Sequence, residues 1–161
     1  MGEGTLYFDL DGVLADFDAG AGKVLDTDNT YKWEWIHGSE AFWQKLNATP
    51  DFFGNLPPCP GALELWDAVK HLAPVILTAL PKKGATDVER QKREWARTHL
   101  GPDAQVITCL THEKPNYCNP CDILVDDRSV NADLWARRGG HFVLHVGPLT
   151  TSNALQQLGV I

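Results

Sequence analysis

Short apolar runs recur along the chain, and segments with helical spacing separate them. The runs are hydrophobic at consecutive rather than alternate positions, as in Val75-Ile76-Leu77, which is typical of strands buried on both faces of a parallel sheet. The alternation of such strands with helices predicts an α/β domain built on a parallel sheet. We expect strands at 5–10, 74–78, 105–110, 123–125 and 141–146, and helices at 60–74, 86–100, 130–138 and 152–158.

Two of these helices carry side chains whose placement can be predicted. The first has Leu63, Trp66, Val69 and Leu72 at helical spacing, and Trp66 is expected to pack in the core. The helix at 86–100 carries Glu89, Arg90, Arg93 and Glu94. A helix face with this charge is usually solvated, so composition alone places Lys92 at the surface.

One interval interrupts the alternation directly after the first strand. It contains a helical start at 19–25, a polar stretch at 26–30, and then Trp33, Trp35, Phe42, Trp43, Phe52 and Phe53. An aromatic-rich insertion in this place predicts a small helical cap over the end of the first strand. With 161 residues, the chain suits a single domain, 1–161, with this cap inserted at about 17–58.

The charge of the chain limits its partners. The formal net charge of -7 disfavours binding to nucleic acid or to an anionic membrane. No apolar run has the length of a membrane span, and the strand expected from Thr5 leaves little room for a signal peptide, so we expect a cytoplasmic protein. An acidic chain can hold a phosphate only locally, through a cation, a few lysines and backbone N–H groups. The sequence carries no signal for an oligomeric state.

Four cysteines, with one histidine among them, offer two interpretations. Reduced thiols are expected in a chain of this size without an export signal. The grouping of Cys109, His112, Cys118 and Cys121 also contains four possible zinc ligands. Its spacing matches no common zinc pattern, and Cys109 falls in an expected strand, where a thiol is usually part of the core. Reduced thiols are therefore the favoured interpretation, with a zinc site as the alternative.

Two carboxylates end the first strand. Asp9 and Asp11 follow an apolar run at positions i and i+2, so both can face the same side, and Gly12 then permits a tight turn. In open α/β sheets, ligands bind beyond the carboxyl ends of the strands. Because two close carboxylates repel each other, a divalent cation is their natural partner.

Later strands supply complementary groups at the same edge of the sheet. Thr78 ends the second strand and offers a hydroxyl group, and the backbone N–H that follows it belongs to Ala79. Lys114 follows the third strand, and Asp126-Asp127 ends the fourth. The carboxylates add oxygen ligands of the kind that Mg²⁺ prefers.

Taken together, Asp9-x-Asp11-Gly12-Val13, Thr78, Lys114 and Asp126-Asp127 resemble, in order, the four motifs of the haloacid dehalogenase superfamily. One such motif is weak evidence, whereas four in order at strand ends are specific. The resemblance implies a Rossmann-like parallel sheet of the haloacid dehalogenase type, with a small helical cap inserted after the first strand.

Within the superfamily, residues 5–128 are similar to the 5'(3')-deoxyribonucleotidases. The similar stretches are Asp9 to Phe17, Phe52-Phe53 through Leu56-x-Pro58-x-Pro60-Gly61-Ala62, Lys92-x2-Trp95 through His99-Leu100-Gly101-Pro102, Leu110-Thr111-x2-Lys114, and Ile123 to Arg128. Where that family has Thr-Ser-Pro, this chain has Thr78-Ala79-Leu80. The cap of this chain is also shorter than that of the family.

The resemblance implies a magnesium-dependent hydrolysis of a phosphate monoester. Asp9 would attack phosphorus and form an aspartyl-phosphate, and Asp11 would protonate the leaving oxygen and then accept a proton from water. Mg²⁺ would lie between Asp9, the backbone carbonyl of Asp11, and Asp127, with Asp126 reaching it through water.

The resemblance also implies a set of substrate contacts. Thr78, Ala79 and Lys114 would hold the phosphoryl oxygens. Lys92 matches a lysine of the family, which competes with its interpretation as a surface residue. Phe17 stands at the family position that contacts the base, and Trp33 and Trp35 offer further flat surfaces in the cap. The expected substrate is a nucleoside 5'-monophosphate, preferably deoxy and pyrimidine.

Other functions stay open at this stage. The same fold supports phosphotransfer, mutase and dehalogenase chemistry, although a dehalogenase has no need of Asp11. Another small phosphate metabolite could replace the nucleotide. A phospho-accepting receiver module of a signalling system also uses carboxylates, a threonine and a Lys-Pro such as Lys114-Pro115, but in a different order along the chain. A catalytically silent scaffold protein is the remaining alternative.

Overall fold

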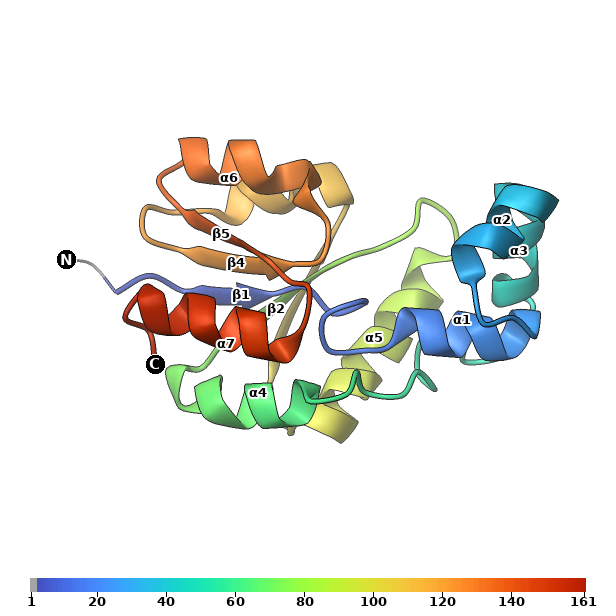
Figure 1. Cartoon of the computed structure of the whole chain (residues 1–161), viewed down its shortest axis with the longest axis horizontal. Coiled ribbons are helices and arrows are strands. Elements are labelled where there is room, and N and C mark those ends of the chain that lie inside the picture. The colour runs from blue at the N-terminus through green and yellow to red at the C-terminus, as the bar shows by residue number, and fades with distance from the viewer. Residues whose placement is uncertain (1–2) are drawn as a thin grey trace.

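The computed structural model describes residues 3–161, and its centre is a five-stranded parallel sheet. The strands are β1 (Leu6–Phe8), β2 (Val75–Ala79), β3 (Gln105–Cys109), β4 (Ile123–Asp126) and β5 (His141–Leu144). They lie in the order β3-β2-β1-β4-β5, and every neighbouring pair is parallel. The predicted α/β class with a Rossmann-like parallel sheet is therefore confirmed (Figure 1).

The position of each strand in the sheet explains its composition. All residues of the central strands β1 and β4 are buried, as their uninterrupted apolar runs predict. The edge strands are less buried, with Gln105 exposed at the start of β3 and both ends of β5 exposed. Because β2, β1 and β4 are parallel neighbours, their carboxyl ends meet in the middle of one edge of the sheet. Asp9, Thr78 and Asp126 lie at this edge.

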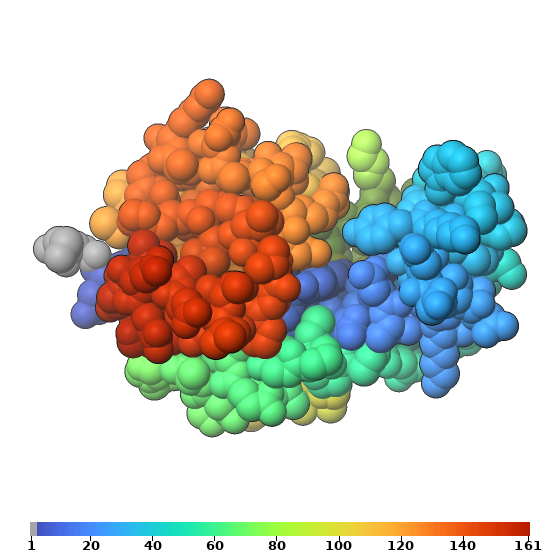
Figure 2. All heavy atoms as spheres, in the orientation of Figure 1, coloured from blue at the N-terminus to red at the C-terminus, as the bar shows by residue number. Residues whose placement is uncertain are grey.

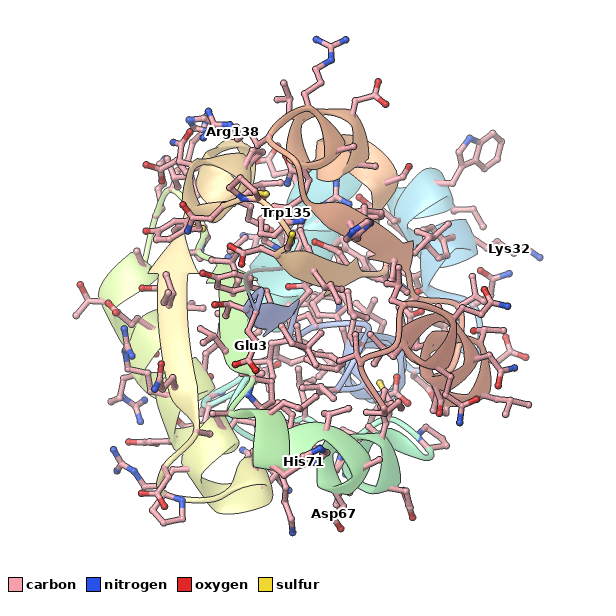
Figure 3. The ribbon with its side chains drawn as sticks, turned by 90° about the vertical axis from the view of Figure 1, so that its left-hand side faces the viewer. Glu3, Lys32, Asp67, His71, Trp135 and Arg138 are labelled. Atoms are coloured by element: carbon pink, nitrogen blue, oxygen red, sulfur yellow. The ribbon has the colours of Figure 1, made fainter. Side chains whose placement is uncertain are left out.

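Helices cover both faces of the sheet. In Figure 1, α6 (Ala132–Arg137) lies above the sheet, and α4 (Ala62–Val69) and α7 (Pro148–Gln157) lie below it. The long helix α5 (Ala85–Leu100) connects β2 to β3. Three 3-10 segments lie in the connections between these elements: η1 (Lys70–Leu72), η2 (Thr111–Tyr117) and η3 (Ser129–Asn131). In the view of Figure 3, Trp135 lies between α6 and the sheet, whereas Arg138, Asp67 and Lys32 point outward.

Helix α4 buries only some of the apolar residues that stand at helical spacing in this segment, Trp66 among them. Its buried residues are Ala62, Leu65, Trp66 and Val69, whereas Leu63 is 37% exposed and Leu72 is 38% exposed. A strict spacing of three drifts around a helix of 3.6 residues per turn, so Leu63 rotates off the face that Trp66 and Val69 share. Leu72 lies beyond the end of the helix, in η1.

Helix boundaries also differ from the predicted ones. The last helix begins at Pro148 rather than Ser152, because proline suits the first helical position, where no backbone N–H is needed. The segment expected as a helix from Val130 starts as the 3-10 turn η3 and becomes α-helical only at Ala132.

The aromatic-rich segment after β1 folds into three helices: α1 (Phe17–Leu25), α2 (Thr30–His37) and α3 (Ser39–Asn47). Asp16 caps α1 by accepting from the N–H of Ala19, and Asn29 caps α2 by accepting from the N–H of Lys32. These helices form a lobe at one end of the molecule (Figures 1 and 2). Their role as a cap stays a prediction.

The chain leaves and rejoins the sheet domain at neighbouring points. The N–H of Asp16 donates to the carbonyl of Pro57 at 2.7 Å, and the N–H of Cys59 donates to the carbonyl of Leu14, also at 2.7 Å. The two ends of the inserted segment are thus held side by side. Within residues 3–161, no helix is long and apolar enough to cross a membrane.

Candidate active site

A cavity of about 940 Å³ lies where the carboxyl ends of the central strands face the helical lobe. Figure 2 shows the surface hollowed between this lobe and the rest of the molecule. From the sheet domain, the cavity is lined by Asp9, Asp11, Gly12, Cys59, Thr78, Ala79, Leu80, Pro81, Lys83, Lys92, Thr111, Lys114, Asp126, Asp127, Arg128 and Val130. From the lobe and its two connections, it is lined by Asp16, Phe17, Asp18, Thr30, Tyr31, Glu34, Phe42, Trp43, Asn47 and Phe53.

Lys114 joins two carboxylates at the floor of this cavity. Its ammonium nitrogen lies 3.1 Å from Oδ1 of Asp9 and 2.8 Å from Oδ2 of Asp126. All three side chains are buried. Burial acts against the charge of Lys114, but Asp9 and Asp126 raise the pKa of its ammonium group to about 12. The lysine therefore stays charged and holds both carboxylates in place.

Asp9, Asp126 and Asp127 form the carboxylate cluster of the site. One oxygen of each lies within 4.8 Å of the others. Burial raises the pKa of Asp9 to about 8, against the opposing effect of Lys114, and burial together with Asp126 raises the pKa of Asp127 to about 6. Three acids in this space carry more negative charge than one lysine offsets.

Gly12 permits the approach of Asp127 to the end of β1. Its φ of +81° lies in the left-handed region, and a Cβ atom at this position would collide with the carboxylate of Asp127. Only glycine therefore fits between the two strand ends, as the sequence Asp9-x-Asp11-Gly12 predicts for the turn.

Lys92 is not a surface residue, and the composition-based prediction is wrong. It is 4% exposed, and its ammonium nitrogen contacts Oδ2 of Asp11 at 3.0 Å. It also donates to Oγ1 of Thr78 at 3.0 Å and to the carbonyl of Ala79 at 2.7 Å. The ring of Phe53 covers it, with its centroid 5.2 Å away. Helix α5 thus places a second lysine in the site, in contact with Asp11.

The aromatic residues of the lobe divide into two groups. Phe17 lines the cavity and packs against Phe42, Trp43, Phe52 and Phe53. The structure does not bring Trp33 or Trp35 to the cavity. Trp33 packs on His37 and Phe42, and Trp35 is 87% exposed.

Tyr31 and Trp43 line the cavity instead, although sequence reasoning did not single them out as site residues. The faces of α2 and α3 that turn toward the cavity depend on the exact start of each helix. The sequence signal for the start of α2 was its N-cap residue, Asn29. A helix that starts at Thr30 has Thr30, Tyr31 and Glu34 at adjoining positions of one face.

The cysteines do not converge on a common point. Cys109 and Cys118 are buried in the core beside Trp135, and the thiol of Cys118 donates to the carbonyl of Trp135 at 3.4 Å. Cys121 and His112 are exposed. Among residues 3–161, Asp9, Asp126 and Asp127 form the only group of three or more metal-binding side chains.

Comparisons with known proteins agree with this geometry. Residues 3–146 match the family model described as "5' nucleotidase, deoxy (Pyrimidine), cytosolic type C protein". The chain is 30% identical, over 142 residues, to the mitochondrial 5'(3')-deoxyribonucleotidase of Mus musculus, a match that covers 74% of this chain and 62% of the mouse protein.

Solved structures agree on the fold. A haloacid dehalogenase superfamily hydrolase from Ehrlichia chaffeensis superposes with a TM-score of 0.57 at 15% identity and covers 98% of both chains. A hydrolase from Streptococcus pneumoniae gives a TM-score of 0.56 at 12% identity, covering 99% of this chain and 100% of that one. The family match spans most of the chain and includes every acid of the carboxylate cluster. The chain therefore belongs to the cytosolic type C deoxy-pyrimidine 5'-nucleotidase family, whose members are phosphoric monoester hydrolases.

Proposed function

We propose that this chain hydrolyses nucleoside 5'-monophosphates, with Asp9 as covalent nucleophile, Asp11 as general acid and base, and Mg²⁺ as the required cation. The observation that carries the proposal is the convergence of Asp9, Asp126, Asp127 and Lys114 at the floor of a cavity of nucleotide size. Family membership supports the reaction class, and the fold places these groups where α/β proteins bind their ligands.

The carboxylate cluster fits a small, hard divalent cation. Its donors are oxygens, and Asp9 and Asp126 are buried. The raised pKa values of Asp9 and Asp127 result from burial and from repulsion that a cation would relieve. Asp9, Asp126, Asp127 and the backbone carbonyl of Asp11 would hold the ion. When bound, Mg²⁺ supplies positive charge to the carboxylates and to the phosphoryl oxygens.

Asp9 is the proposed nucleophile because Lys114 fixes its carboxylate at the floor of the cavity. One oxygen of Asp9 attacks phosphorus while the bond from phosphorus to the ester oxygen breaks. Water then attacks the phosphorus of the aspartyl-phosphate, which releases inorganic phosphate and restores Asp9. In both steps, the positive charge of Lys114 offsets the negative charge on the phosphoryl oxygens, and the hydroxyl of Thr78 donates a hydrogen bond to one of them.

Asp11 is the proposed proton carrier. It gives a proton to the departing ester oxygen and takes one from the attacking water. Lys92 orients its carboxylate through the contact at 3.0 Å with Oδ2, and Thr78 holds Lys92 in place by accepting from its ammonium group at 3.0 Å. Oδ1 of Asp11 is buried without a hydrogen-bond partner among residues 3–161. That oxygen therefore keeps an unused capacity to accept a hydrogen bond. The three acceptors already bound to Lys92 support a role in orienting Asp11 rather than direct phosphate binding.

The nucleoside is proposed to lie against the inserted helices, and residues 17–58 are proposed to act as the cap. Phe17, Tyr31 and Trp43 offer ring surfaces in the cavity, and stacking of a base on such a ring is worth about 1–3 kcal/mol. A preference for deoxy and pyrimidine nucleotides is the part of the proposal that rests on the family alone.

The test is a substrate panel assayed for released phosphate. We expect kcat/KM for dCMP, dUMP, dTMP, UMP and AMP to exceed that for glucose 6-phosphate by tenfold or more, with turnover that continues over many cycles. A hexose phosphate that equals the nucleotides would refute the nucleotide assignment and leave the phosphatase assignment intact. A single stoichiometric release of nucleoside, with the phosphoryl group retained on the protein and no inorganic phosphate released, would instead favour a receiver-like function.

A further inference from the structure

The segment 51–56, which returns from the inserted helices to the sheet domain, is fastened to helix α5 (Figure 1). The indole N–H of Trp95 donates to the carbonyl of Leu56 at 2.8 Å, and the N–H of Gly54 donates to Oε1 of Gln91 at 3.1 Å. The same helix contributes a lysine to the cavity. One helix therefore contacts both the returning segment and the catalytic centre.

Gln91 is a buried amide whose two ends are both engaged. Its side chain belongs to a residue that is only 5% exposed. Oε1 accepts from Gly54, and Nε2 donates to Oδ2 of Asp87 at 2.7 Å, one turn earlier on α5. Asp87 is itself held by Arg90 at 2.7 Å. A buried amide with both ends hydrogen-bonded keeps one orientation, so Gln91 fixes the position of the backbone at Gly54.

The residue before Gly54 is Phe53, which lines the cavity and covers Lys92. The centroid of its ring lies 5.2 Å from the ammonium nitrogen, a distance at which a cation and an aromatic face attract each other. The three N–H groups of this ammonium already contact three acceptors of the catalytic centre, among them Asp11. The ring thus shields a cation whose donors are all in use.

We infer that Gln91 is a positioning residue for the proton carrier, an inference that rests on the proposed nucleotidase function. Its contact with Gly54 keeps the ring of Phe53 in place, and this ring excludes water from Lys92. Without the ring, water would compete for the ammonium group and weaken its contact with Asp11. The carboxylate of Asp11 would then lose the fixed orientation that proton transfer to the leaving group requires.

Kinetics of Gln91→Met on two substrates test the inference. Methionine fills similar space but cannot accept from Gly54. We therefore expect kcat for dCMP to fall about tenfold with little change in KM, a fraction of the factor of about 10²–10⁴ that general acid catalysis contributes. The kcat for p-nitrophenyl phosphate should change little, because its leaving group needs little protonation. Gln44→Met, at an exposed position on α3, is the control, and its kinetics should equal those of the wild type.

A double-mutant cycle separates positioning from a merely structural role. If Gln91 acts through Lys92, Gln91→Met should cause no further loss of kcat in a Lys92→Met background. Gln91→Glu retains an oxygen that can accept from Gly54, so its kcat for dCMP should lie closer to the wild-type value. Gln91→Asn, whose amide is too short to reach Gly54, should behave like Gln91→Met and takes its place in the cycle if the methionine variant does not fold.

The outcomes separate this inference from the proposed function. An equal loss on dCMP and p-nitrophenyl phosphate would overturn the inference, as would a loss that persists undiminished in the Lys92→Met background. A lower melting temperature with unchanged kcat for dCMP would also overturn it, because Gln91 would then only support the fold. In these cases the nucleotidase function stands, since wild-type turnover measures it. Wild-type protein that hydrolyses p-nitrophenyl phosphate but no nucleotide would overturn the proposed function, and the inference with it.

Discussion

Lys92 and Asp11 form an ion pair with a nitrogen–oxygen distance of 3.0 Å, although one residue lies on a helix and the other follows the first strand. The lysine side chain is 5% exposed and that of the aspartate 25%, so the pair is anchored from inside the protein and opens toward the cavity. A carboxylate held in this way can keep one orientation while it exchanges protons with a substrate.

Replacing Lys92 with methionine should impair Asp11 more than substrate binding. We expect Lys92→Met to lower kcat for dCMP by a factor of about 10² while KM changes less, because general acid catalysis typically contributes about 10²–10⁴. The loss should be smaller for p-nitrophenyl phosphate, whose leaving group needs little protonation. Arg97→Met, at an exposed position on the same helix, is the control. Equal losses on both substrates would contradict a role that acts through Asp11.

Replacing Asp9 with asparagine should abolish turnover and preserve the fold. The amide is not an anionic nucleophile, so no aspartyl-phosphate can form. At pH 7 we expect thermal stability to be equal to or above that of the wild type, since the change removes one of three clustered acids. Folded Asp9→Asn protein that keeps most of the wild-type rate would refute the proposed mechanism.

Removal of divalent cations should stop the reaction reversibly. We expect no phosphate release after exhaustive chelation and full recovery with added Mg²⁺. Asp127→Asn should require a higher Mg²⁺ concentration for half-maximal activity, whereas Asp133→Asn, in the first turn of α6, should not. Calorimetric titration with Mg²⁺ gives a readout independent of activity. Full activity of the chelated protein would exclude the metal requirement.

Phe17 should matter for nucleotides and not for small aryl phosphates. Loss of base stacking in Phe17→Ala should lower kcat/KM for dCMP by about tenfold, from the 1–3 kcal/mol that stacking contributes. Turnover of p-nitrophenyl phosphate serves as the internal control for the packing that Phe17 also provides. If both substrates lose the same factor, the ring of Phe17 only packs against its aromatic neighbours.

Acid should destabilise the protein through His145. This side chain is 8% exposed, and its Nδ1 lies 2.6 Å from Oγ1 of Thr151. Burial lowers the pKa of His145 below its ordinary value of 6.5, so the folded state favours the neutral ring. The resulting stability is present above pH 6.5 and is lost as the pH falls through the lower, folded-state pKa.

Urea unfolding at pH 7.5 and pH 5.5 measures whether the protein loses stability on acidification. The decrease in midpoint on acidification should be smaller in His145→Gln than in the wild type. His71→Gln, at an exposed position in η1, should behave like the wild type. A decrease that is the same in all three proteins would show that other groups cause the acid sensitivity.

The sheet and its catalytic edge could be predicted from sequence because both depend on local patterns. Uninterrupted apolar runs identify buried strands, and the acids at their ends must lie beyond the sheet. Asp9, Asp126 and Lys114 were predicted in this way and lie in contact.

Lys92 shows where such reasoning failed. Its neighbours Glu89, Arg90, Arg93 and Glu94 suggested a solvated face. However, Val88, Gln91, Lys92 and Trp95 lie on one helical stripe, and all four are buried. A lysine on a buried helical stripe indicated a buried charge with a partner, but only the fold shows that this partner is Asp11. Trp33 and Trp35 failed for another reason, since a small rotation of the eight-residue helix α2 exchanges the residues that face the cavity.

The paired hydrogen bonds at Asp16–Pro57 and Leu14–Cys59 make the inserted segment modular. Since its ends are already held together, the segment can be lengthened, shortened or exchanged at little cost to the sheet, because closure entropy grows only slowly with loop length. Selection on substrate choice can then act on residues 17–58 while Asp9 and Lys114 keep their positions. A chimaera that carries the corresponding segment of the mouse relative between Asp16 and Pro57 would therefore test whether this segment determines substrate choice, with Asp9 and Lys114 left in place.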